Sequence, residues 1–152
     1  VAVTIPAGST GNRSYTATYT ANTYTVTADA NGGIIPATTG WEVATEGATA
    51  TKTVTYDEVY GTLPEPTKTG YTFAGWEDEN HNTYDATDTV QITVDTTIIA
   101  KWTIDSYTVT YNCNGGQVSS SNTDTTFTED VNYNDLIDLT KTAYRDGYTL
   151  IG

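Results

Sequence analysis

The sequence predicts a mostly β protein of the α+β class, in which small sheets of antiparallel and mixed strands are each crossed by a short helix. The first observation is composition: 35 Thr, 11 Val and 9 Ile are β-branched, against four Leu and no Met in 152 residues. β-branched side chains lose rotamer freedom in helices and pack well on pleated sheets. The second observation is that segments of alternating apolar and polar residues recur along the chain.

One set of short motifs occurs twice. Residues 24–33 read YTVTADANGG and residues 107–116 read YTVTYNCNGG, so that residue 24 corresponds to residue 107. The other matches are residues 15–20 (YTATYT) with 98–103 (IIAKWT), 54–59 (VTYDEV) with 131–136 (VNYNDL), and 70–75 (GYTFAG) with 147–152 (GYTLIG). The second copy is shorter in its middle. Because length differences collect in loops, we expect residues 33–51 to lie at the surface.

The repeat divides the chain into three parts. We expect residues 1–22 to be the closing strand of a preceding repeat, residues 23–104 a complete repeat, and residues 105–152 the first part of a following, truncated repeat. Both ends are then expected to be cut from a longer array. The third part lacks a closing strand, whereas residues 15–20 are a spare one. We therefore expect the spare strand to lie against the open half of a neighbouring molecule, or the third part to be partly frayed.

Period-two alternation predicts the strands of the complete repeat. The expected strands are residues 24–28, 52–56, 71–76 and 97–102. Between the second and third of them, residues 57–63 predict one or two helical turns. Thr55 or Asp57 would cap these turns, and Pro64 and Pro66 would end them.

In the second copy, residues 134–139 predict a better helix with Asn134 as its N-cap, and the replacement of the prolines by residues 138–143 (DLTKTA) allows it to run longer. Two strands, a crossing helical turn and two further strands are the order of the β-grasp fold. A sheet this narrow needs a cover on one face, which the helical turn would supply.

The motifs resemble the Listeria–Bacteroides repeat, the B-repeat type of internalin-like bacterial surface proteins. They are Tyr24–Gly33, Val54–Trp76 and Ala100–Trp102, and together with their second copies they span nearly the whole chain. The resemblance implies a ubiquitin-like β-grasp unit, repeated in tandem on exported cell-surface proteins as a stalk, spacer or accessory adhesion module. It implies no enzymatic activity. The motif positions expected to be structural are Asn31, Gly32, Gly33, Gly70, Tyr71, Gly75, Trp76, Trp102, Tyr107, Gly147 and Tyr148.

Charge excludes several classes of function. Six Lys and Arg stand against 19 Asp and Glu, a net charge of −13, and an acidic chain repels nucleic-acid backbones. No apolar run approaches the roughly 20 residues of a membrane-spanning helix, so we expect no membrane insertion within these residues. The expected location is the bacterial cell surface, although neither a signal peptide nor an anchor stands within residues 1–152.

Candidate chemistry is sparse. Cys113 is the one cysteine, and because its counterpart is Ala30, a small buried hydrophobe is expected there. One cysteine and one histidine, His81, predict neither a catalytic thiol nor a zinc site, and we expect no cofactor. Residues 77–82 (EDENHN) with Asp85 and Asp88 form a cluster rich in oxygen ligands, but without the order of a calcium loop. A solvated hairpin tip is favoured, whereas calcium and covalent cross-links through lysine stay open.

The aromatic residues leave one alternative function. Trp76, Trp102 and Tyr71 recur at fixed repeat positions, which favours core packing over a sugar-stacking platform. Trp41 is tied to no repeat position and lies in the long middle loop, so it is the aromatic residue we expect to contact a ligand, if any does. The alternative is therefore a module that binds a carbohydrate or a host surface protein, in addition to neighbouring repeats.

Overall fold

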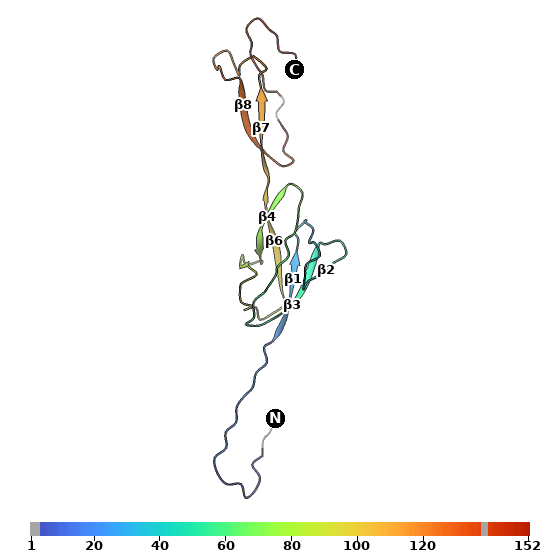
Figure 1. The fold of residues 1–152 in the computed structure, drawn as a ribbon, viewed down its shortest axis with the longest axis vertical. Coiled ribbons are helices and arrows are strands. Elements are labelled where there is room, and N and C mark those ends of the chain that lie inside the picture. The colour runs from blue at the N-terminus through green and yellow to red at the C-terminus, as the bar shows by residue number, and fades with distance from the viewer. Residues whose placement is uncertain (1–3, 138–139) are drawn as a thin grey trace.

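The computed structural model describes residues 4–137 and 140–152. It is elongated, with two β units in line and the N-terminal segment extending from the far end of the first (Figure 1). We call the part from residue 23 to residue 104 the first unit and the part from residue 105 onward the second unit. No helix among the described residues is long and apolar enough to cross a membrane.

A six-stranded mixed sheet forms the first unit. Its strands are β1 (Thr23–Asp29), β2 (Glu42–Val43), β3 (Thr49–Thr55), β4 (Tyr71–Glu77), β5 (Thr83–Tyr84) and β6 (Thr96–Ile104). They lie in the order β2-β3-β1-β6-β4-β5, and β1 and β6 are the parallel pair in the middle. All four strands predicted for this unit are confirmed, because period-two burial is a local property that the sequence carries directly.

A two-stranded antiparallel sheet forms the second unit, from β7 (Ser106–Asn112) and β8 (Thr126–Asn132). β7 occupies the repeat position of β1, and β8 that of β3. The register agrees with this correspondence, since Tyr107 pairs with Val131 as Tyr24 pairs with Val54.

The expected α+β fold class, a β-grasp unit crossed by a helix, is wrong. Residues 4–137 and 140–152 contain strands, turns and irregular segments but no helix, so the described structure is all-β. The first predicted helical segment instead bonds to a neighbouring segment of chain. The backbone N–H of Tyr60 donates to Asp88 at 3.0 Å, that of Gly61 to Ala86 at 2.9 Å, and that of Val90 to Glu58 at 2.7 Å.

These bonds explain why a helix does not form there. A helix needs the same N–H groups for carbonyls four residues earlier in its own segment. Asp57 and Gly61 also have φ values of 68° and 67°, outside the right-handed helical region. The local helical preference of residues 57–63 is therefore outweighed by hydrogen bonds to residues 86–90, which lie far away in the sequence.

The second predicted helix does not form at its expected start either. Asn134 has a φ of 66°, whereas a helix N-cap has the backbone of an extended residue. Leu136 is 97% exposed, so it does not cover a sheet face. Residues 138 and 139 of that prediction lie outside the described residues.

The hydrophobic core lies in the first unit. It combines alternate residues of β1, β3 and β6 and one residue of β4 with side chains from the connecting segments. It comprises Val26, Ala28, Ala30, Ile35, Trp41, Ala50, Val54, Tyr60, Trp76, Val90, Ile98 and Ala100. In the described part of the second unit no hydrophobic side chain is buried to this degree. Burial of large aliphatic and aromatic groups contributes about 1.5–3 kcal/mol each, so the first unit carries most of the stability.

Candidate functional site

A groove of about 580 Å³ is formed by motif residues of the first unit. Its walls are the Asn-Gly-Gly turn after β1, the loop before β4, and aromatic side chains of β4 and β6. The residues that line it include Gly32, Gly33, Lys68, Tyr71, Phe73 and Trp102. Aromatic walls around one cation are a common composition of a binding site.

Lys68 is the charged group of this groove. Its Nζ lies 4.6 Å from the centre of the Tyr71 ring and 5.7 Å from that of Trp102. It also donates a hydrogen bond of 3.0 Å to the backbone oxygen of Asn31. An ammonium group has three donors, so the cation both fixes the turn and remains a charged group in the groove.

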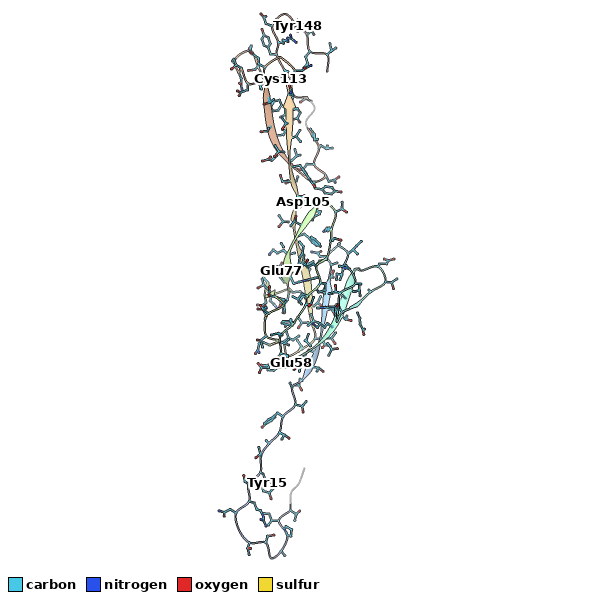
Figure 2. All side chains as sticks on the ribbon, viewed as in Figure 1. Tyr15, Glu58, Glu77, Asp105, Cys113 and Tyr148 are labelled. Carbon is cyan, nitrogen blue, oxygen red and sulfur yellow. The ribbon has the colours of Figure 1, made fainter. Side chains whose placement is uncertain are left out.

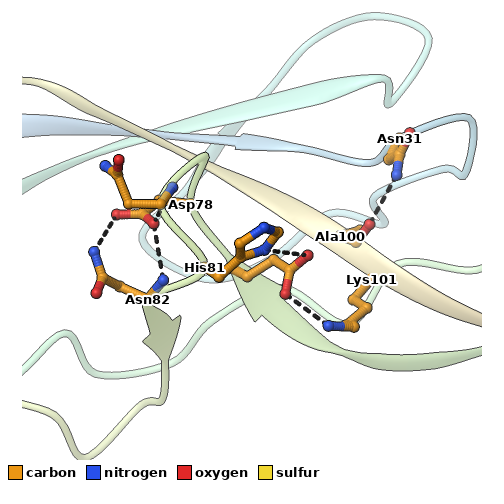
Figure 3. A network of polar contacts seen from close by, with 8 residues as sticks. Asn31, Asp78, His81, Asn82, Ala100 and Lys101 are labelled. Carbon is orange, nitrogen blue, oxygen red and sulfur yellow. Dashed lines mark hydrogen bonds and ion pairs between the residues drawn. The ribbon is translucent and has the colours of Figure 1, made fainter.

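The turn itself is held from β6. The side-chain amide of Asn31 donates to the oxygen of Ala100 at 3.1 Å (Figure 3), and the indole N–H of Trp102 donates to the oxygen of Ala30 at 3.1 Å. A Cβ at Gly33 would lie 2.6 Å from the Trp102 ring. The Asn-Gly-Gly motif is therefore needed for Trp102 to pack against the backbone and form the groove wall.

The second unit repeats this arrangement. Arg145 stands at the repeat position of Lys68, and its guanidinium lies 4.1 Å from the ring of Tyr148, the counterpart of Tyr71. Gln117 and Tyr144 form a β-bridge where Ile34 and Thr67 do so in the first unit. A smaller groove, of about 240 Å³, includes Arg145 and Tyr148 in its lining.

The recurrence of the cation is a signal that sequence reasoning missed. Two of the chain's six Lys and Arg residues occupy the same repeat position, although 19 residues are acidic. Among the described residues, the lining of neither groove includes an aspartate or glutamate. Aligning charged residues between the copies, as well as aromatic ones and glycines, would have found this site.

Trp41 lies in the core and not at the surface. It is 7% exposed, and its indole N–H donates to the oxygen of Thr62 at 2.8 Å. The Nζ of Lys52 lies 5.9 Å from the ring centre. A ligand platform needs an accessible ring face, so this placement gives no support to ligand contact at Trp41.

The aromatic residues of β4 and β6 pack on one another. Trp76 is buried and donates its indole N–H to the oxygen of Pro64 at 2.9 Å. The Phe73 ring lies between those of Trp76 and Trp102, at centroid distances of 5.4 and 5.7 Å. Cys113 is half-buried, whereas its counterpart Ala30 is fully buried.

The remaining motif positions lie at turns, at a strand irregularity or at the surface. Gly75 has a φ of 122° at the point where the β4–β6 register shifts. Gly147 has a φ of 75° in the turn before Tyr148, which is exposed. Tyr107 on β7 is also exposed.

Residues 78–82 of the acidic cluster form the tip of the β4–β5 hairpin, whereas Asp85 and Asp88 follow β5. Asp78 accepts hydrogen bonds of 2.9 Å from the backbone N–H and the side-chain amide of Asn82 (Figure 3). It also accepts one of 2.9 Å from the backbone N–H of Asn80 and one of 3.0 Å from the Tyr84 hydroxyl. The Asn82 side chain is the main cause that lowers the pKa of Asp78. Burial, followed by the bond to Asp78, raises the pKa of Tyr84. The carboxylate oxygens of Asp78 are therefore used in hydrogen bonds within the hairpin.

The neighbouring charges of this hairpin are paired. Glu77 lies 2.8 Å from Lys101 and 3.6 Å from His81, and the hydrogen bond from Lys101 lowers the pKa of Glu77. Within residues 4–137 and 140–152, no group of three His, Cys, Asp or Glu residues is placed to hold a metal ion.

A braced joint connects the two units. β6 ends at Ile104 and β7 begins at Ser106, so Asp105 alone separates them, and it lies between the units in Figure 2. Its N–H donates to Gly70 at 2.9 Å, and its backbone oxygen accepts from the N–H of Tyr133 at 2.8 Å. Its carboxylate also accepts from the Thr72 hydroxyl at 2.7 Å.

Tyr133 completes the joint from the second unit. Its ring contacts that of Tyr71 edge-on at a centroid distance of 6.3 Å. A Cβ at Gly70 would overlap the Tyr133 ring, so glycine is required at this contact. One of these contacts recurs at the start of the first unit. The backbone N–H of Tyr56, the counterpart of Tyr133, donates at 2.9 Å to the oxygen of Asn22, the counterpart of Asp105.

The motifs, their spacing and the doubled groove define a tandem repeat module, and the chain belongs to the Listeria–Bacteroides repeat domain family. The family model matches residues 24–101 and 107–152, which confirms the resemblance found from the motifs. The chain is also similar to Internalin H of Listeria monocytogenes, with 31% identity over 109 residues. That match covers 70% of this chain but 18% of Internalin H. No solved structure matches the chain.

Proposed function

We propose that the chain is a non-enzymatic, extracellular repeat module of a bacterial surface protein and acts there as a stalk or spacer. Membership of the repeat family and the similarity to Internalin H support this location. Residues 23–104 serve as one complete repeat, residues 105–152 as the first part of the next, and residues 1–22 as the closing strand of a preceding one. The observation that carries the function is the joint at Asp105.

A stalk must transmit orientation from one repeat to the next, and the joint is suited to this. Flexible linkers are Gly- and Ser-rich and several residues long, whereas here one residue separates two strands. Backbone hydrogen bonds fix Asp105 to both units, and the Tyr133 ring fills the space over Gly70. Units held in this way keep their axes aligned, so that each added repeat extends the array.

The experiment measures stiffness between spin labels at Glu46→Cys and Ser121→Cys, two exposed loop positions in different units. The background variant is Cys113→Ala, which installs the residue of the matching repeat position. We expect a narrow distance distribution that Tyr133→Ala broadens. The matched control is Tyr56→Ala, the counterpart tyrosine at the other end of the first unit. A distribution that is already broad before Tyr133 is changed contradicts the stalk.

A second candidate function is an accessory adhesion module that binds a carbohydrate or a host protein. The doubled groove favours it, because a cation on a tyrosine ring recurs in both units and the lining residues are free of acidic side chains. Such a site suits a ligand with a carboxylate next to an apolar face. The groove, rather than Trp41, is then the binding surface.

The test is binding of the chain to an array that includes sialylated and uronic-acid glycans. We expect Lys68→Gln combined with Arg145→Gln to abolish binding, and Lys68→Arg to retain it. Lys101→Gln is the matched control, since Lys101 pairs with Glu77 and does not line a groove. Equal binding by the double variant, or no binding to any glycan on the array, counts against this role.

A further inference from the structure

One turn belongs to both the groove and the joint. It begins at Lys68 and ends at Tyr71, whose backbone N–H donates to the oxygen of Lys68 at 3.1 Å, and both residues line the groove. Between them, the backbone oxygen of Gly70 accepts from the N–H of Asp105 at 2.9 Å. The ring of Tyr133 lies where a Cβ of Gly70 would be. The turn therefore contacts the groove through its end residues and the second unit through its centre.

The ring of Tyr71 is packed by the second unit, unlike the ring beside it. Phe73, the next residue on the same face of β4, is held between Trp76 and Trp102 within the first unit. Tyr71 is the first residue of β4, and the ring that contacts it edge-on, at a centroid distance of 6.3 Å, is that of Tyr133. Packing against a second ring restricts the rotamers that a half-buried side chain adopts. Both units together therefore set the position of Tyr71.

Lys68 depends on Tyr71 in turn. Its Nζ lies 4.6 Å from the centre of the Tyr71 ring and donates to the oxygen of Asn31 at 3.0 Å, so that it links this turn to the one after β1. A cation is attracted to the face of an aromatic ring, so the orientation of the ring affects how firmly the ammonium is held. Movement of Tyr71 therefore changes the charged group of the groove.

We propose that Tyr133 is a positioning residue of the groove in the first unit. Its ring holds Tyr71 in the orientation that receives the Lys68 ammonium, so that each repeat organises the groove of the repeat before it. Tyr133 does not itself line the groove and acts through the turn. The use of the groove for binding rests on the proposed adhesion role, whereas the coupling is a property of the chain without ligand.

The coupling works in both directions. A ligand that contacts Lys68 and Tyr71 restricts the turn, and the restricted turn keeps the oxygen of Gly70 in its hydrogen bond across the joint. Two equilibria that are linked through one element affect each other by the same factor. Ligand binding should therefore make the joint stiffer, and a docked second unit should strengthen binding in the groove.

The first test changes no further residue of the second unit. Lys68→Ala removes the cation from the turn, and the contacts of this side chain with the ring of Tyr71, the ring of Trp102 and the turn after β1 all lie within the first unit. With the same pair of spin labels and the same background, we expect this change to broaden the distance distribution between the units. Lys68→Arg should keep the distribution narrow, because arginine also stacks on aromatic rings. Lys101→Ala is the matched control in the first unit and should have no effect.

The second test observes the groove directly by NMR of 13C-labelled lysine. The ammonium end of Lys68 lies over the Tyr71 ring, whose ring current shifts the neighbouring CH₂ protons upfield. Tyr133→Ala should move this signal downfield, toward that of Lys101, because Tyr71 is no longer held beside the ammonium. Tyr133→Phe keeps the ring and should leave the signal in place. Tyr56→Ala, at the other end of the first unit, is the matched control and should also leave it in place.

Two results overturn the proposal. One is a distance distribution that stays as narrow in Lys68→Ala as in Lys101→Ala, and the other is a Lys68 signal that Tyr133→Ala leaves in place. A distribution that is broad before any of these changes contradicts the stalk, and the Lys68 signal then decides the coupling. For any glycan that the array identifies, Tyr133→Ala should weaken binding about fivefold or more. Absence of glycan binding contradicts the adhesion role, whereas the two measurements without ligand still decide the coupling.

Discussion

The three residues of the Asn31-Gly32-Gly33 turn are required for different physical reasons. Asn31 and Gly32 have φ values of 48° and 79°, which glycine and asparagine adopt at lowest cost. Gly33 has no such φ but is enclosed, because a Cβ there would lie 2.6 Å from the Trp102 ring and 2.8 Å from the oxygen of Thr67. Its counterpart Gly116 is enclosed in the same way, 2.7 Å from the oxygen of Tyr144.

This distinction predicts unequal costs of alanine. Gly33→Ala should lower the free energy of unfolding of the first unit by about 3 kcal/mol, since ring and backbone leave no room for a methyl group. Gly40→Ala is the control, with a φ of 81° and no atom within 4 Å, and should cost only about 1 kcal/mol. Denaturant titration followed by tryptophan fluorescence measures both. Equal costs would mean that the groove wall yields easily.

At the scale of elements, the sequence is reliable where structure is local. Alternation locates β1, β3, β4 and β6 because the two faces of a strand differ in burial at every second residue. The predicted helix fails because residues 57–61 find hydrogen-bond partners in residues 86–90, about thirty positions along the chain. The seven residues on which the helix was predicted, 57–63, do not include these partners, so the pattern within them cannot reveal the pairing. The loop that was expected to be surface likewise places Trp41 in the core.

At the candidate site, too, some residues could be identified from the sequence and others only from the tertiary structure. Its glycines and aromatics were identified as motif positions, because they recur. Lys68 and Arg145 were missed, since a single charged residue in a loop is ordinary until its ring partner is known. The β-bridge that brings the Lys68 loop beside the turn, between Ile34 and Thr67, is a tertiary contact.

Across the whole molecule, the two units share motifs but not stability. All buried hydrophobic side chains of the core lie between Val26 and Ala100. The described second unit has two paired strands, a size that is marginal in water. Its contact with the first unit through Tyr133, which bonds to Asp105 and packs on Tyr71, is the source of further support.

This inequality predicts two unfolding transitions. The three tryptophans, Trp41, Trp76 and Trp102, all belong to the first unit, so their fluorescence reports that unit alone. In dilute solution, the amides of β7 and β8 should exchange hydrogen faster than those of β1 and β6. Far-ultraviolet circular dichroism should begin to change at a lower denaturant concentration than tryptophan fluorescence. Coincident transitions would show instead that the joint makes the two units one cooperative structure.

The sequence by itself determined the β character, the duplication, the positions of the main strands and the family, because composition and alternation act residue by residue and a repeat is visible wherever it occurs. Only the tertiary structure decided that residues 57–61 are not helical, that Trp41 is core, that two cations sit on two tyrosines, and that Asp105 is braced on both sides. Each of these depends on contacts between residues far apart in the chain, whose free energy outweighs weak local preference.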